Sequence, residues 1–354
     1  MSLNHPIIRL KGSAYERGVA YGKAAKKQIL HSLQTYRTLF ACHANMTWEQ
    51  ALDCAKAFEK DFLEYLPQAQ DEMKGIAEGA DVTYGDILAL NCRSELMFAL
   101  PDGCSTLAVL PESSRDGDTY LAQTWDWIMP ARASTVILDI DQSPAPRILM
   151  VAEAGMIGGK GLNDKGIGVT LNALSIGRGR IGVPLHAMYR GILNSTLLTD
   201  AMDRVAQCKR AGAGNFNLAS SQGLAFCMEY TPDGYDVLSS LGEPLCHTNH
   251  YLSPLFRAED KLKIQVSDTF VRLNRLQRRA YAKAGELDTA SIMEIFSDHA
   301  NCPDSVCSHE DPNDHEAKRF CTVYAIVMNL TKRSLYITNG YPCEGPAYEV
   351  KMTA

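Results

Sequence analysis

Residues 102–106 read Asp102-Gly103-Cys104-Ser105-Thr106 and mark the point where the character of the sequence changes. Before this pentapeptide, apolar residues recur at helical spacing. After it, short alternating runs bounded by turn residues are typical of strands. Cys104 is therefore predicted to begin a strand, directly after a glycine. A buried strand cysteine would explain this residue without any chemistry, so its function depends on what surrounds it.

The part of the chain before the pentapeptide is predicted to be helical. Ser13 and Thr47 each precede a helical pattern of apolar residues and have a glutamate or glutamine three positions on, which is typical of a capping box. Two further helices are predicted over 68–79 and 84–97.

The part after the pentapeptide is predicted to alternate between strands and helices. The first two strands, 104–110 and 120–127, are separated by a polar turn. The remaining elements are expected as strands 135–140, 148–153 and 168–173, a helix at 184–208, strands 216–220, 225–230 and 235–238, helices 268–284 and 288–300, and strands 322–330 and 334–339.

This order of elements indicates an α+β fold. Two antiparallel sheets with helices packed on their outer faces would bury every apolar surface. We therefore predict a four-layer αββα sandwich.

The composition narrows the classes of partner. The 354 residues are 46% hydrophobic and 21% charged, as in an ordinary globular protein, and the net charge of -6 argues against nucleic acid or an anionic membrane. The eleven cysteines form no C-x-x-C pair, and the first residues lack a basic patch followed by an apolar run, so free thiols in a reducing compartment are expected. We expect a cytoplasmic protein with a small-molecule substrate.

Several familiar motifs are absent from the sequence. There is no G-x-x-x-x-G-K-[ST], no strand-linked G-x-G-x-x-G and no G-x-S-x-G elbow. Phosphate binding and serine-hydrolase chemistry therefore have no local support, and we expect no cofactor.

One cluster offers a metal-dependent alternative. His299, Cys302, Cys307, His309 and His315 lie within seventeen positions, and both residue types are zinc ligands. A zinc-dependent hydrolase that uses the first four is therefore a rival hypothesis. The spacing H-x2-C-x4-C-x-H is not that of a standard zinc knuckle and a proline interrupts it. We expect no metal, and a loop that packs some of these side chains.

A second polar group is His247-Thr248-Asn249-His250. The two histidines could act as ligands or as a base. A histidine pair three positions apart with no third partner is more often structural.

The pentapeptide allows a mechanism of its own. A glycine permits close approach, so the Cys104 thiol could attack the preceding carbonyl and shift the acyl group from nitrogen to sulfur. Hydrolysis would then leave Cys104 as a new N-terminus. Its α-amine would have a pKa of about 7.7–8.0 and could accept the proton of its own thiol, which is already strongly nucleophilic.

At this point the sequence resembles the isopenicillin-N acyltransferase family of cysteine N-terminal-nucleophile enzymes. The resemblance runs in consistent order from about residue 9 to 340. It implies an αββα sandwich that is made as a precursor and cuts itself into a helical chain, 1–103, and a β-rich chain, 104–354, which share one domain. The stretches that carry it are 102–106, 123–126 and 247–250, with further matches at 75–80, 153–158, 182–184 and 305–307.

The resemblance implies roles around the cut. Gly103 matches the residue before the cleaved bond, and Cys104 matches the nucleophile. Asp126 matches an aspartate beside the new amino terminus, where a carboxylate would hold an α-ammonium. Thr106 matches a hydroxyl implicated in the self-cleavage, although as a strand residue it needs no such explanation.

Two further roles concern the acyl-transfer step. Asn249 matches a side chain that donates to the oxyanion, a task suited to an amide NH2. Arg319 matches an arginine near the site. The loop 308–318 differs from the penicillin enzyme in length and composition, so a solvated surface role for Arg319 stays open.

The predicted function is that of a self-activated cysteine amidohydrolase or acyltransferase. It would act on a small acylated amine, or on acyl-CoA, through an acyl-Cys104 intermediate. The chain lacks the peroxisomal C-terminal tripeptide of the penicillin enzyme, which leaves substrate and compartment open. The alternatives are a β-alanyl-amine hydrolase and an inactive, uncut relative in which Cys104 is structural.

Overall fold

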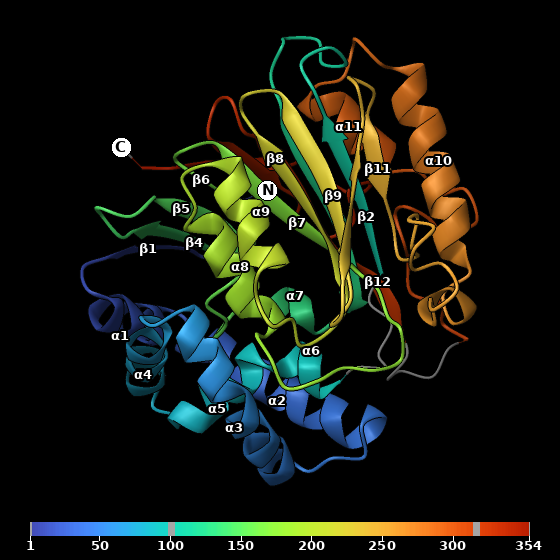
Figure 1. Cartoon of the computed structure of the whole chain (residues 1–354). Helices are drawn as coiled ribbons and strands as arrows, with labels where there is room; N and C mark the ends of the chain where they lie inside the picture. The colour runs from blue at the N-terminus through green and yellow to red at the C-terminus, as the bar shows by residue number, and fades with distance from the viewer. Residues whose placement is uncertain (1, 98–102, 314–318, 354) are drawn as a thin grey trace.

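The computed structural model describes residues 2–97, 103–313 and 319–353, which form two stacked β-sheets with helices outside them (Figure 1). Neighbouring strands within each sheet are antiparallel, except for the parallel pair β1–β4. The eight-stranded sheet has the order β1 (Ile7–Lys11), β4 (Thr135–Asp141), β5 (Ile148–Glu153), β6 (Lys160–Asn163), β7 (Ile167–Ala173), β8 (Gly214–Ser220), β9 (Leu224–Tyr230) and β10 (Tyr235–Ser239). The six-stranded sheet has the order β11 (Leu245–His247), β2 (Gly103–Val109), β3 (Tyr120–Ile128), β12 (Phe320–Asn329), β13 (Ser334–Ile337) and β14 (Tyr348–Lys351).

Helices cover the outer sides of both sheets and confirm the predicted αββα order. Two helices pack on the eight-stranded sheet, two pack on the six-stranded sheet, and the N-terminal helices gather at one end of the sandwich (Figure 1). The N-terminal helices are α1 (Ala14–Ala24), α2 (Lys26–His43), α3 (Trp48–Tyr65), α4 (Ala69–Ala80), α5 (Tyr84–Asn91) and α6 (Arg93–Leu96). The later helices are α8 (Leu185–Leu193) and α9 (Leu198–Ala206) on the first sheet, a 3-10 turn at Leu262–Ile264, and α10 (Asp268–Ala282) and α11 (Thr289–Phe296) on the second. The short helix α7 (Ala131–Ser134) contacts α2 and β12.

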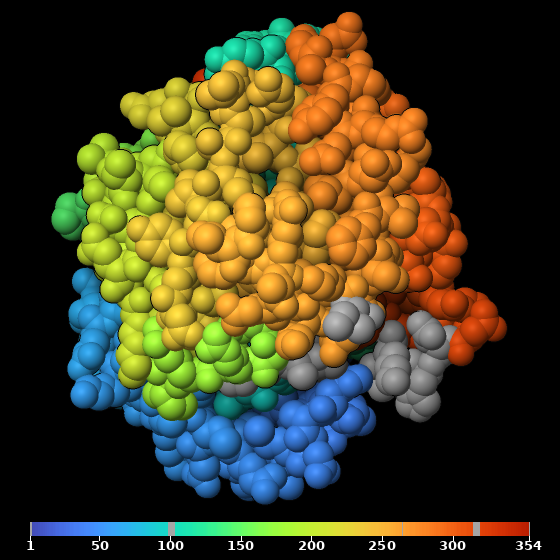
Figure 2. All heavy atoms as spheres, turned by 45° about the vertical axis from the view of Figure 1, so that its right-hand side comes forward, coloured from blue at the N-terminus to red at the C-terminus, as the bar shows by residue number. Residues whose placement is uncertain are grey.

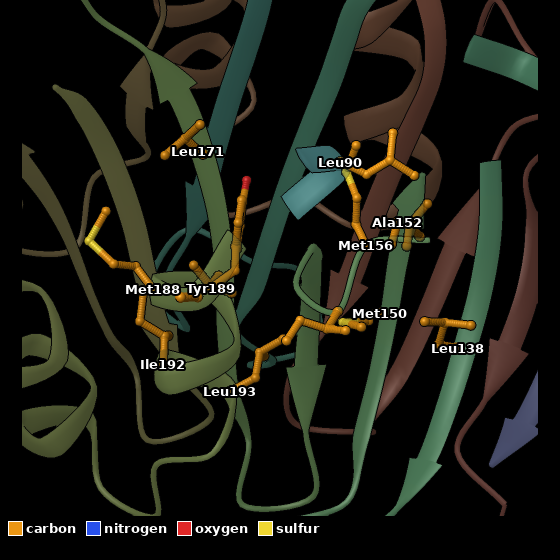
Figure 3. Packing of buried hydrophobic residues seen from close by; sticks show 14 of the residues in the cluster. Leu90, Leu138, Met150, Ala152, Met156, Leu171, Met188, Tyr189, Ile192 and Leu193 are labelled. Atoms are coloured by element: carbon orange, nitrogen blue, oxygen red, sulfur yellow. The ribbon is translucent and has the colours of Figure 1, made fainter. Parts of the chain in front are cut away.

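The larger hydrophobic core joins the helical N-terminal segment to the strands that follow it. Its buried residues come from α1 to α5, from α8 and from the facing sides of both sheets. Figure 3 shows one part of this core, where Leu193 of α8 points toward Met150 of β5. Segments on both sides of Cys104 therefore contribute to one core.

Strand β2 is buried on both faces. Since side chains alternate along a strand, successive residues enter different cores. Cys104 and Ala108 belong to the larger core, whereas Leu107 and Val109 belong to a second core shared with α10 and α11. Seen from the side of α10, the surface consists mainly of residues that follow β9, coloured yellow to orange (Figure 2). The candidate nucleophile thus lies inside the sandwich.

Several sequence-based predictions about elements were wrong. The helix predicted at 84–97 is divided into α5 and α6, and strands β6, β11 and β14 were not predicted. The first residues were not assigned a strand, but residues 7–11 form β1, since pairing with the edge of β4 gives their alternating pattern a buried face. The single helix predicted at 184–208 is two helices. It breaks because Asn163 draws the carbonyls of Leu193 and Ser195 to its side-chain amide, at 3.0 and 2.8 Å.

The predicted helix starts are confirmed at Ser13 and Thr47, each of which forms a capping box with the residue three positions on. Within the described residues, no helix is both long and apolar enough to cross a membrane.

Candidate active site

Cys104 is the second residue of β2, and its side chain is 1% exposed. Its strand lies between β3, which pairs with the whole of β2, and β11, which pairs with Thr106 to Ala108. The register places Gly103 opposite Asp126 and Cys104 opposite Trp125. A cysteine in this position has little freedom of its own, and the groups around it determine its chemistry.

Gly103 lies against Asp126 so closely that no side chain fits. A Cβ atom built on this glycine would be 2.8 Å from Cβ of Asp126 and 3.1 Å from its Oδ2. Carbon atoms that are not bonded do not approach this closely, so an alanine would push the aspartate away. The glycine before the predicted cut is therefore required for the position of the carboxylate.

Asn249 contacts the bond that is predicted to be cut. Its Oδ1 accepts from the backbone N–H of Cys104 at 2.9 Å and from Nη2 of Arg272 at 2.9 Å. Both partners are donors, which fixes the amide with its oxygen toward Cys104. The Nδ2 group donates to the carbonyl of Ala173 at 3.1 Å, and a second N–H of the same group remains for another acceptor.

Arg272 on α10 reaches the backbone of the nucleophile from the other side of the sheet. Its Nη1 donates to the carbonyl of Cys104 at 2.9 Å and to Oγ of Ser105 at 3.3 Å, and its Nε donates to Oδ2 of Asp268 at 2.6 Å. The residue is 2% exposed. Sequence reasoning missed it, because an arginine in a helix with several charged residues looks like part of a solvated face.

Asn172 on β7 was also missed and brings the eight-stranded sheet into the site. Its Nδ2 donates to the carbonyl of Cys104 at 3.2 Å and to that of His247 at 3.4 Å. Its Oδ1 accepts from Asn217 at 2.9 Å and from Asn215 at 3.3 Å. A row of buried asparagines in two strands is the signal that could have drawn attention to it, since buried polar side chains need partners.

Asp126 is buried and held by a hydroxyl. Thr322 of β12 donates from Oγ1 to Oδ1 of Asp126 at 2.7 Å, and this threonine hydroxyl accepts from the backbone N–H of Ser308 at 2.9 Å. Thr106 points to the same face of β2 as Cys104, and its buried hydroxyl has no hydrogen-bond partner among the residues that the structure describes. The predicted residues Gly103, Cys104, Thr106, Asp126 and Asn249 are thus brought together.

The two histidines beside Asn249 have structural partners. His247 lies between Oε1 of Glu229 and the carbonyl of Thr248, each at 2.7 Å. His250 contacts Oγ1 of Thr269 at 2.9 Å, and burial lowers its pKa to about 4, which keeps it neutral. The same Thr269 hydroxyl accepts from the N–H of Asn249 at 2.8 Å. His250 and the backbone of Asn249 thus share the Thr269 hydroxyl, and neither histidine needs a catalytic role to explain its position.

Arg319 directly precedes β12, is partly exposed, and donates to the carbonyl of Pro312 at 3.0 Å. The guanidinium that contacts Cys104 and Asn249 belongs to Arg272, so a site role for Arg319 stays a prediction.

Asp102 and His315 lie outside the described residues. His299, Cys307 and His309 do come together, but with Cys343 as the fourth member in place of Cys302.

A pocket lies near Asn249: Ala173, whose carbonyl accepts from the amide of Asn249, is one of its lining residues, whereas Asn249 and Cys104 are not among them. Glu95 also lines the pocket. Its Oε1 accepts from the N–H of Leu185 at 2.8 Å, its Oε2 is buried without a hydrogen bond to any described residue, and burial raises its pKa to about 7. The apolar walls are formed by Met97, Trp127, Leu171, Leu174, Met188 and Tyr230.

The chain is similar to a protein family, to a known enzyme and to two solved structures. Residues 113–343 match the family described as acyl-coenzyme A:6-aminopenicillanic acid acyl-transferase, a match that begins after Cys104. The acyl-coenzyme A:6-aminopenicillanic-acid-acyltransferase 40 kDa form of Emericella nidulans is 26% identical over 342 residues, which are 95% of this chain and 92% of that protein. Among solved structures, a mutant of the conjugated bile acid hydrolase from Clostridium perfringens has a TM-score of 0.48 and 12% identity, covering 70% of this chain and 92% of that one. An N-acylethanolamine-hydrolyzing acid amidase ortholog from Caenorhabditis elegans has a TM-score of 0.45 and 13% identity, covering 64% and 93%.

Proposed function

The chain belongs to the acyl-coenzyme A:6-aminopenicillanic acid acyl-transferase family, and from this premise we propose that it cuts its own Gly103–Cys104 bond to become a cysteine N-terminal-nucleophile enzyme. The observation that carries the proposal is the set of polar groups on both sides of this bond. Asn249 accepts from its N–H, Asp126 lies against Gly103, and Arg272 holds the carbonyl that follows.

The cut proceeds in two balanced steps. The Cys104 sulfur attacks the carbonyl carbon of Gly103, the carbon–nitrogen bond breaks, and the nitrogen takes the thiol proton, which leaves a thioester. Water then adds to the thioester, so that Gly103 ends in a carboxylate and Cys104 recovers its thiol. The new α-amine inherits the position of the old N–H, 2.9 Å from Oδ1 of Asn249. Asp126 supplies the negative charge that an α-ammonium requires nearby.

In the matured enzyme, the α-amine of Cys104 accepts the proton of its own thiol. The sulfur attacks the substrate carbonyl, and the remaining N–H of the Asn249 amide donates to the oxyanion that develops. The leaving amine takes a proton from the α-ammonium, and an acyl-Cys104 remains. Water releases the acid in an amidohydrolase, and an acceptor amine releases the amide in an acyltransferase.

The two chains stay together after the cut because they share a hydrophobic core. Residues of α1 to α5 pack with residues of both sheets in that core. We therefore expect residues 1–103 and 104–354 to copurify without denaturant.

The pocket beside Asn249 favours a small acylated amine with an apolar acyl group. Its walls are formed by leucine, methionine and aromatic side chains, which gain free energy from burying hydrocarbon. Glu95 is the one observation that favours the β-alanyl alternative, because the ammonium of a β-alanyl group would pair with Oε2, which has no hydrogen-bond partner among the described residues. Hydrolysis of a phenylacetyl amide and of a β-alanyl amide, each with wild type and Glu95→Gln, distinguishes the two. Loss of only the β-alanyl activity in the variant would select that class.

Self-cleavage is tested by intact mass and N-terminal sequencing of wild type, Cys104→Ala and Cys246→Ala. Cys246 is a matched control, since it is a buried cysteine on the adjacent strand β11, opposite Leu107, and belongs to the second core. Wild type and Cys246→Ala are expected to give fragments 1–103 and 104–354, with Cys-Ser-Thr leading the second. Cys104→Ala is expected to stay whole. If wild type stays whole after long incubation, or if Cys104→Ala is cut at the same bond, the proposal fails.

A further inference from the structure

Four side chains from three separate segments converge beside the start of β12, and none of them lines the pocket near Asn249. His299 follows α11, Cys307 and His309 lie in the segment before β12, and Cys343 lies between β13 and β14. Each offers one ligand atom, and all four atoms lie within 4.8 Å of one another. Thirty-four positions separate His309 from Cys343, so the convergence is made by the fold and not by local sequence.

The separations between these atoms agree with the edges of a tetrahedron around zinc. Zinc binds imidazole nitrogen at about 2.0–2.1 Å and thiolate sulfur at about 2.3 Å, which gives edges of about 3.3 Å between nitrogens, 3.6 Å between nitrogen and sulfur, and 3.8 Å between sulfurs. Nε2 of His299 and Nε2 of His309 are 3.2 Å apart. Nε2 of His309 is 3.5 Å from the sulfur of Cys307 and 3.5 Å from that of Cys343. The two sulfurs are 3.6 Å apart.

Hydrogen bonds alone do not account for this arrangement. Nε2 of His309 lies near three polar atoms, while a ring nitrogen has one in-plane direction in which to donate or accept. A disulfide between Cys307 and Cys343 would bring the sulfurs to about 2.05 Å and would leave two imidazole nitrogens facing each other. A single cation at the centre satisfies all four atoms together.

We propose that His299, Cys307, His309 and Cys343 bind one zinc ion in a closed structural site. Two thiolates with two imidazoles are a ligand set that zinc prefers among the divalent metals. Four protein ligands leave no open position for water, so the site does not perform the hydrolysis that the zinc-hydrolase hypothesis assigned to this region. The fourth ligand is Cys343, and the exposed Cys302 is not part of the set.

The zinc site would fix the segment that supports Asp126. Ser308 lies between the ligands Cys307 and His309, and it exchanges two hydrogen bonds with Thr322: the N–H of Ser308 donates to Oγ1, and the N–H of Thr322 donates to the carbonyl of Ser308, each at 2.9 Å. Thr322 in turn donates to Asp126. Metal binding therefore cross-links residues 299–309 to the loop around Cys343 and stabilises the same segment. The zinc site does not depend on the proposed function.

The test uses full-length protein in the Cys104→Ala background, so that failure of self-cleavage and failure of metal binding are distinguished. Zinc is measured by inductively coupled plasma mass spectrometry after reduction, addition of excess zinc and gel filtration. We expect about one zinc per chain, a higher melting temperature with zinc than without, and visible thiolate-to-metal absorption when cobalt replaces zinc.

Two variants test which cysteine is the zinc ligand: Cys343, which the fold brings to the cluster, or Cys302, which lies near His299 in the sequence. Cys343→Ser is expected to bind zinc at least about 100-fold more weakly and to lose part of the cobalt–thiolate absorption. Cys302→Ser, which changes an exposed cysteine three residues after His299, is expected to match the parent protein. The proposal is overturned if the reduced parent protein retains no zinc, or if Cys302→Ser loses zinc while Cys343→Ser keeps it.

Discussion

Cys104 and Cys307 are both buried thiols, 1% and 0% exposed, yet their surroundings differ in kind. The backbone of Cys104 is contacted by the amides of Asn249 and Asn172 and by the guanidinium of Arg272. Cys307 faces a second thiol and an imidazole. Polar groups directed at backbone atoms position a cysteine, whereas soft ligands directed at the sulfur itself suit a metal.

The comparison shows that burial and strand position do not define the task of a cysteine. The two thiols are also connected, because Thr322 hydrogen-bonds both Ser308, next to Cys307, and Asp126, next to Gly103. Three experiments test how far the surroundings of Cys104 and Cys307 are independent. They change Arg272 beside Cys104, the Thr322 hydroxyl that joins the two regions, and Glu95 in the pocket.

The largest effect is expected from Arg272→Leu. Its loss would leave the carbonyl of Cys104 and Oδ1 of Asn249 short of a charged donor inside the protein, which misplaces both groups. We expect self-cleavage to slow by about 100-fold or more, followed on denaturing gels over time. Arg319→Leu is the matched comparison, and its partly exposed side chain is expected to matter less. A folded Arg272→Leu protein that cuts at the wild-type rate would contradict the assignment.

A smaller effect is expected from Thr322→Val, which keeps the shape but removes the hydroxyl that joins the two regions. Asp126 loses a donor, and we expect cleavage to slow by about tenfold, as for one hydrogen bond of about 1.4 kcal/mol. Thr338→Val is the control, because Thr338 is equally buried and donates to Gly340 on the far side of β12. If both variants slow self-cleavage equally, the effect comes from lower stability and not from the lost hydrogen bond to Asp126.

The smallest effect on the cut, but a clear one on stability, is expected from Glu95→Gln. Burial raises the pKa of this carboxyl from 4.5 to about 7. Below pH 4.5 both folded and unfolded chains hold the proton; between pH 4.5 and 7 only the unfolded chain loses it, so stability falls as pH rises through this window. The free energy of unfolding lost across this window is about 3 kcal/mol. In the Cys104→Ala background, urea unfolding at about pH 5 and about pH 8 should show this loss for the parent and not for the glutamine variant.

A good part of the molecule could be predicted from the sequence. The change of pattern at residues 102–106 located the start of β2, and the capping residues Ser13 and Thr47 located two helix starts, because both signals act between neighbours in the chain. Strand β1 and the break after α8 were missed, since a partner strand and a distant asparagine side chain decide them. The αββα order followed from the order of elements and from the resemblance together.

The sequence by itself determined most of the helices and strands, the pentapeptide around Cys104, and the cluster of histidines and cysteines near residue 300. Only the tertiary structure decided which side chains meet them. Arg272 reaches Cys104 across 168 positions, and Cys343 replaces Cys302 beside His309 across 34. The physical reason is the same in both cases. Hydrogen bonds and ligand bonds act over about 2–3 Å, and only the packing of separate elements brings distant parts of the chain within that range.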